Sequence, residues 1–293
     1  MRGLIPSLLI LVLLLSLFAC GGSARKEERL VIASIYPYEI LVKQMVGEDF
    51  RVQTLIPPNA SPHTYSPKPR EIEDLHNAEL VIANGFGLET NLRQAFDSVG
   101  DKLVLVQDLL NLPEEEGANP HVWLSPPLMQ QLVILLNDRL QTAFPEHSEV
   151  IANNSVDLVA QIAALSAQIA RERSTFARTP LITFHDSFHH FVRDYGIEYL
   201  GSVQSSAGRE PSPRELARIG DLIRENGVRA IYVEPQMDKK SAAALANEFD
   251  LQIIELDPLG HTFKPETYMD IILNNWEGMK LGWQARNETP ANY

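Results

Sequence analysis

The chain has 293 residues and a formal net charge of −13, with 25 Lys and Arg against 38 Asp and Glu. This acidic balance argues against a nucleic-acid groove, which needs clustered basic side chains. The hydrophobic fraction of 45% is ordinary for a globular protein, and the length allows two modest domains.

The N-terminal residues predict secretion and lipid attachment. Arg2 precedes an apolar run at 4–19, which is shorter than a membrane span of about 20 residues and typical of a signal peptide. The run ends in LFAC, which resembles a bacterial lipobox, and Cys20 is the single cysteine of the chain. We assign 1–19 to a signal peptide of the lipoprotein type and 20–28 to a flexible tether. The alternative is a plain secretory signal with an incidental cysteine.

Short apolar runs alternate with helical patterns in the first half of the chain. We expect strands at 30–34, 51–56, 80–83 and 103–106. We expect helices at 38–46, 70–77 and 127–144, the last one capped by Ser125. Strands that alternate with helices predict a parallel sheet with crossover helices.

A long helix should follow this first half. Residues 146–176 contain neither Gly nor Pro, and their apolar side chains recur at helical spacing, from Val156 to Ile169. We expect one helix of roughly thirty residues, which is unusually long for a globular domain. It is either an ordinary core helix or a backbone that joins two lobes.

The alternating pattern then restarts. We expect strands at 181–184, 198–203, 229–233 and 252–256, helices at 188–195, 213–225, 240–249 and 265–283, and a mobile loop at 204–211. The sequence therefore predicts an N-terminal α/β lobe at 29–145, a linking helix at 146–177 and a C-terminal α/β lobe at 178–293.

Three of the eight histidines share one context. His63 follows the second strand, His121 lies in a loop before a helix, and His185 ends the first strand of the second half. Ligands gather at the carboxyl ends of parallel strands, so the three imidazoles are candidates for one cleft. Asp257 and Glu234 end strands in the same way.

These residue types favour a metal-binding site. Three imidazoles and one carboxylate fill a tetrahedral zinc shell and leave no position for a reactive water, which indicates binding rather than catalysis. Imidazole suits Zn²⁺ better than Mg²⁺ or Ca²⁺, whereas Mn²⁺ would favour a second carboxylate. His189, His190 and His261 are weaker candidates, while His76 and His147 lie in polar helical stretches.

Several segments together resemble one family. SPHTYSPKPREIEDLHNAELVIANGFGLE, NPHVWLSP, TFHDSFHHF and ELDPLG occur in that order. They resemble signatures of the cluster A-I (cluster 9) solute-binding proteins, the metal-binding lipoproteins that feed zinc and manganese ABC importers. The resemblance covers about residues 30–283. It implies two Rossmann-like α/β lobes joined by one backbone helix, a metal cleft between the lobes, and a monomer that meets an ABC permease and ATPase complex.

The resemblance also implies a ligand set. Its four ligand positions fall on His63, His121, His185 and Asp257. Relatives regarded as manganese binders often carry glutamate as the third ligand, so His185 favours Zn²⁺. Many zinc relatives have a His-rich loop before the second signature, but LPEEEGANP stands there in this chain.

Two acidic residues are candidates for groups that hold an imidazole N–H behind the metal. These residues are Asp186 and Glu234. For Asp186, an N-cap of the following helix is the alternative.

We therefore expect a lipid-anchored receptor outside the cytoplasm, not an enzyme, that captures Zn²⁺ and delivers it to an ABC permease. Its affinity should fall below about pH 6, because imidazole must be neutral to bind metal. The alternatives are a manganese receptor of the same type, a secreted zinc hydrolase, and an adhesin or structural lipoprotein stapled by metal. The chain has no HExxH and no GxSxG motif.

Overall fold

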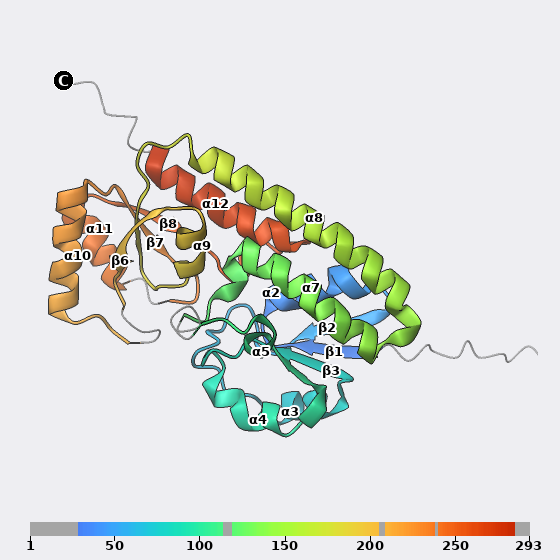
Figure 1. Cartoon of the computed structure of the whole chain (residues 1–293). Coiled ribbons are helices and arrows are strands. Elements are labelled where there is room, and N and C mark those ends of the chain that lie inside the picture. Colours follow the sequence, from blue (N-terminus) through green and yellow to red (C-terminus); the bar gives the residue numbers. More distant parts are fainter. Residues whose placement is uncertain (1–28, 114–118, 205–208, 238–239, 285–293) are drawn as a thin grey trace, which may run out of the picture.

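The computed structural model has two parallel β-sheets, each covered by helices, and one long helix that runs along both (Figure 1). It describes residues 29–113, 119–204, 209–237 and 240–284. Cys20 with the signal peptide and tether, and residues 205–208 of the loop predicted at 204–211, lie outside the described residues.

The first lobe is built from the first half of the chain. Its elements are β1 (Arg29–Ala33), α2 (Tyr36–Val46), β2 (Phe50–Thr54), α3 (Pro69–Asn77), β3 (Leu80–Ala83), η1 (Thr90–Leu92), α4 (Arg93–Asp97), η2 (Gly100–Lys102), β4 (Leu103–Leu105), α5 (Val106–Leu110), η3 (Val122–Leu124) and α7 (Pro126–Ala143).

The second lobe follows the long helix. Its elements, after η4 (Pro145–His147) and α8 (Ser148–Arg173), are β5 (Pro180–Thr183), α9 (His189–Asp194), β6 (Glu198–Ser202), α10 (Pro213–Asn226), β7 (Ala230–Val233), α11 (Lys240–Phe249), β8 (Gln252–Glu255) and α12 (Tyr268–Gln284).

The two sheets have matching topologies. Their strand orders are β2-β1-β3-β4 and β6-β5-β7-β8, and all strand pairs in both sheets are parallel. The predicted fold class, two α/β lobes joined by a long helix, is confirmed. Because the strands of each lobe are parallel, their carboxyl ends lie at one edge of that sheet, where loops from different strands meet.

Local sequence signals account for most element boundaries. Ser125 accepts a hydrogen bond from the Leu128 N–H as the cap of α7, and Ser212 caps α10.

The last helix, α12, begins three residues later than the sequence suggested. The Asp270 carboxylate accepts hydrogen bonds from the Glu266 and Thr267 N–H groups, which places the first turn after Thr267. The short helices α4 and α5, of five residues each, show too few turns for a periodic pattern.

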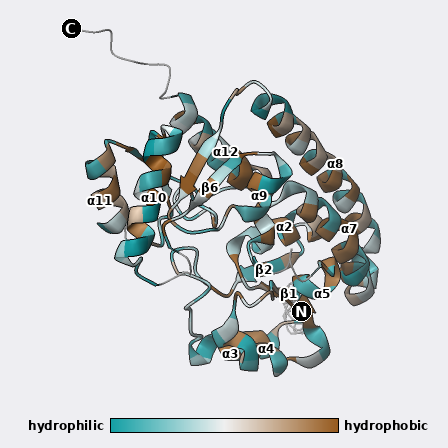
Figure 2. Ribbon diagram, turned by 60° about the vertical axis from the view of Figure 1, so that its left-hand side comes forward, coloured by the Kyte–Doolittle hydropathy of each residue, from teal (hydrophilic) through white to brown (hydrophobic). Residues whose placement is uncertain are grey.

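The long helix α8 is continuous over 26 residues and follows a 3₁₀ turn at Pro145–His147. The helical segment Pro145–Arg173 is long and apolar enough to cross a membrane by length and composition alone. In this fold its apolar side instead packs on α7, α2 and α12, and hydrophobic residues recur along both α7 and α8 in Figure 2. Packing in the core accounts for the buried residues Ile151, Leu158, Ile162, Leu165 and Ile169, whereas Val156 is 69% exposed.

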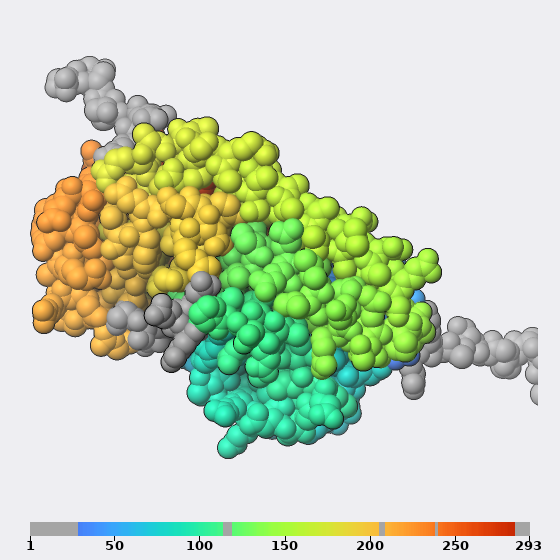
Figure 3. All heavy atoms as spheres, viewed as in Figure 1, coloured from blue at the N-terminus to red at the C-terminus, as the bar shows by residue number. Residues whose placement is uncertain are grey.

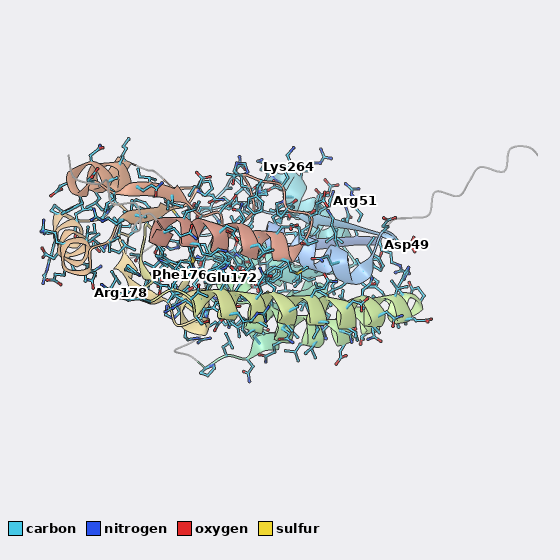
Figure 4. All side chains as sticks on the ribbon, turned by 90° about the horizontal axis from the view of Figure 1, so that it is seen from above. Asp49, Arg51, Glu172, Phe176, Arg178 and Lys264 are labelled. Carbon is cyan, nitrogen blue, oxygen red and sulfur yellow. The ribbon has the colours of Figure 1, made fainter. Side chains whose placement is uncertain are left out.

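Helix α8 is bonded to α12 near its C-terminal end. The Glu172 carboxylate accepts hydrogen bonds from Trp276 Nε1 at 2.7 Å, Lys280 Nζ at 2.6 Å and Gln168 Nε2 at 2.8 Å. Figure 4 places Glu172 between the two helices. These bonds hold the pKa of Glu172 low, at about 2. At the other end, Asn154 Nδ2 donates to the Met45 carbonyl of α2, so α8 is bonded to both lobes.

One hydrophobic core continues from the first lobe into the second. It includes Val81 of β3, Leu158 of α8 and Trp276 of α12, and a smaller cluster lies between the second sheet and the helices α10 and α11. In the space-filling view, helix α8 extends from the first lobe to the second (Figure 3). The lobes are therefore joined by packing as well as by a chain connection.

Replacing Glu172 with alanine should lower the free energy of unfolding by about 1–2 kcal/mol, because the change removes an acceptor shared by a cation and an indole. Urea unfolding followed by circular dichroism measures this. The matched control is Glu277→Ala, which removes the more exposed partner of Lys280 and should cost less than about 0.5 kcal/mol. Equal losses in the two variants would contradict a special role for the contact between α8 and α12.

Candidate metal centre

The three predicted histidines lie together between the lobes. His63 belongs to the loop after β2, His121 immediately precedes η3, and His185 follows β5. Two of these histidines therefore come from the first lobe and one from the second.

The imidazole nitrogens have the spacing of ligands around one ion. His121 Nε2 lies 3.2 Å from His63 Nε2 and 3.3 Å from His185 Nε2. Two nitrogen ligands on a tetrahedral Zn²⁺, with bonds of about 2.05 Å, lie about 3.3 Å apart. Among the described residues, these histidines form a group whose ligand atoms all lie within 4.8 Å of one another. The three residues lie together, as their positions in loops at the expected edges of the sheets suggested.

The space that these rings enclose is small. A cavity of about 20 Å³ is lined by the three histidines and by residues that include Glu234, Gln236 and Pro258. A single water needs roughly 10–15 Å³, so the cavity has room for an ion rather than an organic substrate. His121 and His185 are buried, with 4% and 6% of their surface exposed.

The loop that carries His121 is held by both lobes. Asn84 Nδ2, at the end of β3, donates to the Pro120 carbonyl at 2.9 Å. Trp123 Nε1 donates across the junction to the Pro258 carbonyl at 2.9 Å, and Tyr268 Oη donates to the Trp123 carbonyl at 2.9 Å. These bonds fix the loop on both sides of His121, which lowers the entropy lost when an ion binds.

Asp257, the fourth predicted ligand, is buried at the end of β8 but turned to its own loop. Its carboxylate accepts hydrogen bonds from Leu259 N at 3.2 Å, Thr262 N at 2.7 Å and Thr262 Oγ1 at 2.9 Å. It is not part of the three-histidine group, although its neighbours Pro258 and Leu259 line the cavity. Its assignment as a ligand stays a prediction.

Glu234 lines the cavity from the end of β7 and accepts a hydrogen bond from Ser187 Oγ at 2.6 Å. Burial, together with the nearby charge of Asp257, raises the pKa of Glu234 to about 8. A divalent cation in the cavity would favour the ionised carboxylate, so binding should release a proton from this residue.

Asp186 lies behind His121, with an amide between them. The amide group of Asn119 bonds His121 with its oxygen and Asp186 with its nitrogen. The helix α9 begins only at His189, with Phe188 at its N-cap position, so Asp186 does not cap it. No role for Asn119 was predicted, although it stands two residues before His121.

The weaker histidine candidates lie outside the group. The His190 imidazole donates from Nε2 to the Asn119 carbonyl at 2.9 Å, and His189 lies 3.8 Å from the Asp186 carboxylate. His261 is exposed in the loop before α12. The three-histidine group thus matches the set selected by strand ends.

Burial keeps all three clustered imidazoles neutral. Desolvation lowers the pKa of His63 and, more strongly, that of His121, where the neighbouring His185 adds to the effect. Desolvation and His63 lower the pKa of His185 to about 4. Neutral imidazole is the form that binds metal. The loss of affinity expected below pH 6, which assumed an ordinary imidazole, therefore moves to lower pH.

The sequence and fold match a known family over most of the chain. Residues 31–281 match the profile of the periplasmic zinc-uptake complex component A, ZnuA. The chain belongs to the ZnuA family. The match begins within β1 and ends within α12, so it includes both lobes and the linking helix.

Relatives within this family carry names for two different metals. The chain is 28% identical over 293 residues to the high-affinity zinc uptake system protein ZnuA of Bacillus subtilis, covering 89% of this chain and 92% of that protein. It is 24% identical over 284 residues to the manganese-binding lipoprotein MntA of Halalkalibacterium halodurans, covering 92% and 95%.

A solved structure supports the same architecture. The periplasmic zinc-binding protein TroA of Treponema pallidum superposes with a TM-score of 0.79 at 25% identity, covering 87% of this chain and 99% of TroA. The two-lobed fold with a long helix is therefore the fold of this family.

The metal-free protein should lose stability as the pH falls from about 6.5 to about 4. Over this range the imidazole of His185 is protonated in the unfolded chain but not in the folded chain, because burial lowers its folded-state pKa to about 4. His185 alone accounts for a loss of about 3 kcal/mol across that window. Chemical unfolding of chelator-treated protein at several pH values measures the slope. His185→Gln should reduce the slope without abolishing it, because His63 and His121 also have lowered pKa values, and an unchanged slope would contradict the assignment.

Proposed function

We propose that the chain is the extracytoplasmic receptor of an ABC uptake system and holds one Zn²⁺ between its lobes as cargo. The main observation behind this proposal is that three imidazole nitrogens from two lobes, those of His121 and His185 buried and that of His63 half-buried, converge with the spacing of a tetrahedral zinc site. Membership of the family of zinc-uptake components supports the transport role.

We assign the ligands as His63, His121, His185 and Asp257. The three histidines are already grouped. For Asp257 to bind, its carboxylate must exchange a hydrogen bond from Thr262 for the ion, which a divalent charge can drive. Glu234 and Asp186 would act behind these ligands, Glu234 through its charge and Asp186 through Asn119.

The donor set favours zinc over manganese. Three neutral imidazoles suit Zn²⁺, whereas Mn²⁺ is better served by carboxylate and water oxygens. A cavity of about 20 Å³ also leaves little space for the extra ligands of an octahedral ion. A manganese receptor of the same architecture is the second candidate, because MntA is among the relatives.

The family is a binding component of an uptake complex, so the role is capture and delivery rather than catalysis. We infer that the partners are an ABC permease with its ATPase, and that the receptor acts as a monomer. Cys20 would carry lipid, with 1–19 as the signal peptide and 20–28 as the tether. The lobes would span 29–145 and 178–293, on either side of the linking helix 146–177.

Replacing His121 with alanine should lower zinc affinity by at least about a hundredfold, because the ligand shared by both short nitrogen contacts is lost. Plasma mass spectrometry of purified protein gives the metal content, and competition with a zinc chelator gives the affinity. His76→Ala is the matched control, since His76 is exposed on α3, and it should bind like the unmodified chain.

Native mass spectrometry with equal Zn²⁺ and Mn²⁺ should show one bound zinc per chain. Zinc content unchanged by His121→Ala would refute the site. Occupancy by manganese in the competition would instead select the second candidate.

A further inference from the structure

The side chain of Asn119 lies between the metal-site imidazole of His121 and the opposite lobe. Its Oδ1 atom accepts hydrogen bonds from the His121 backbone N–H at 3.1 Å and from the His121 ring at Nδ1, at 2.9 Å. Its Nδ2 atom donates to the carbonyl and carboxylate oxygens of Asp186, at 2.8 Å and 3.3 Å. One amide therefore contacts both a metal ligand and the second lobe.

These contacts determine the orientation of the amide. A backbone N–H can only donate, so the atom that faces it must be the amide oxygen. The carbonyl of Asp186 can only accept, so the atom that faces it must be the amide nitrogen. The two constraints agree. Because the amide oxygen only accepts, the His121 ring must carry its proton at Nδ1, which leaves the Nε2 lone pair free to face the other histidines.

His185 offers a contrast within the same site. Its Nδ1 atom is buried and has no hydrogen-bond partner among the described residues. The protein therefore selects the ring tautomer of His121 by a direct hydrogen bond but does not do so for His185 in this way. His121 is also the ring that makes both short Nε2 contacts in the group.

The second lobe holds Asn119 at two points. Besides Asp186, which follows His185, the imidazole of His190 on α9 donates to the Asn119 backbone carbonyl at 2.9 Å. Both partners lie in the segment between β5 and the end of α9. Because both hydrogen bonds join the two lobes, they would lengthen if the lobes moved apart.

We propose that Asn119 is a positioning residue that fixes the metal-binding tautomer of His121, and that its hold depends on docking of the second lobe. This inference rests on the proposed metal-binding function. Separation of the lobes then weakens the site in two ways. It moves His185 away from the other two histidines, and it frees Asn119, which orients the His121 ring. Metal affinity and lobe docking become one coupled equilibrium.

The test separates the two contacts of the amide. Asn119→Ala removes both contacts and should weaken zinc binding about 10- to 100-fold, the usual effect of losing a group behind a metal ligand. Asn119→Asp keeps an acceptor for the His121 ring but loses the donor to Asp186. It should keep the tautomer yet speed zinc dissociation about 3- to 10-fold. Stopped-flow chelation measures the dissociation rates.

The control breaks another bond between the lobes, one that involves neither Asn119 nor any of the three histidines. Gln44 Oε1 accepts a hydrogen bond from the Tyr268 N–H at 2.9 Å, and Gln44→Ala should leave zinc dissociation within about twofold of the unmodified rate, because the Tyr268 hydroxyl keeps its bond to the Trp123 carbonyl. A loss equal to that of the Asn119 variants would show a general effect of lobe contacts and overturn the positioning role.

Nitrogen-15 NMR of the chelator-treated protein reports the tautomer of the His121 ring, which would not change if Asn119 had only a structural role. His121 should carry its proton at Nδ1 in the unmodified chain and in Asn119→Asp, and should become a mixture in Asn119→Ala. A proton at Nε2 in the unmodified chain would overturn the proposal, as would an Asn119→Asp variant that releases zinc at the normal rate.

These measurements also distinguish the inference from the function beneath it. Failure of the unmodified chain to bind zinc would refute the proposed function, while the tautomer of His121 is still measurable without metal. If Asn119→Ala does not fold, the tautomer of the unmodified chain and the rate in Asn119→Asp still decide the question.

Discussion

Three neutral imidazoles held against one another in a buried pocket are the constraint on which this site depends. The Nε2 atoms of His63 and His185 lie 3.2 and 3.3 Å from that of His121, close enough that one cation can bind all three. Burial disfavours protonation, so the rings remain ligands where free imidazole would be charged. The three rings are therefore already grouped, and the zinc binding that we propose would need little rearrangement of these side chains.

The junction between the lobes supplies this organisation. Trp123 is buried beside His121 and bonds Pro258 of the second lobe, while Tyr268 bonds the Trp123 carbonyl. Behind the junction, α8 is bonded to α2 at one end and to α12 at the other. Glu234 also lines the cavity, and loss of its proton on metal binding would supply a negative charge against a divalent cation. The contacts that join the two lobes therefore also hold the residues of the site in place.

Much of this arrangement was predictable from local patterns. Every predicted strand is present, and Ser125 and Ser212 cap the helices that they were expected to cap. The start of α12 was missed because a cap formed by Thr267 and Asp270 competes with the apolar pattern. The roles of Asn119 and of Ser187 were not predicted, because amides and hydroxyls occur in most loops.

The sequence by itself determined the α/β class, the long helix and the three histidines, because hydrophobic periodicity and strand ends are local properties that residue order carries directly. Only the tertiary structure decided that His121 is oriented through Asn119, that Asp186 meets it indirectly, and that Asp257 is bonded to Thr262. Those facts depend on distances between residues far apart in the chain, such as the 67 positions between Asn119 and Asp186. Such distances are set by how two lobes pack, and no local pattern encodes them.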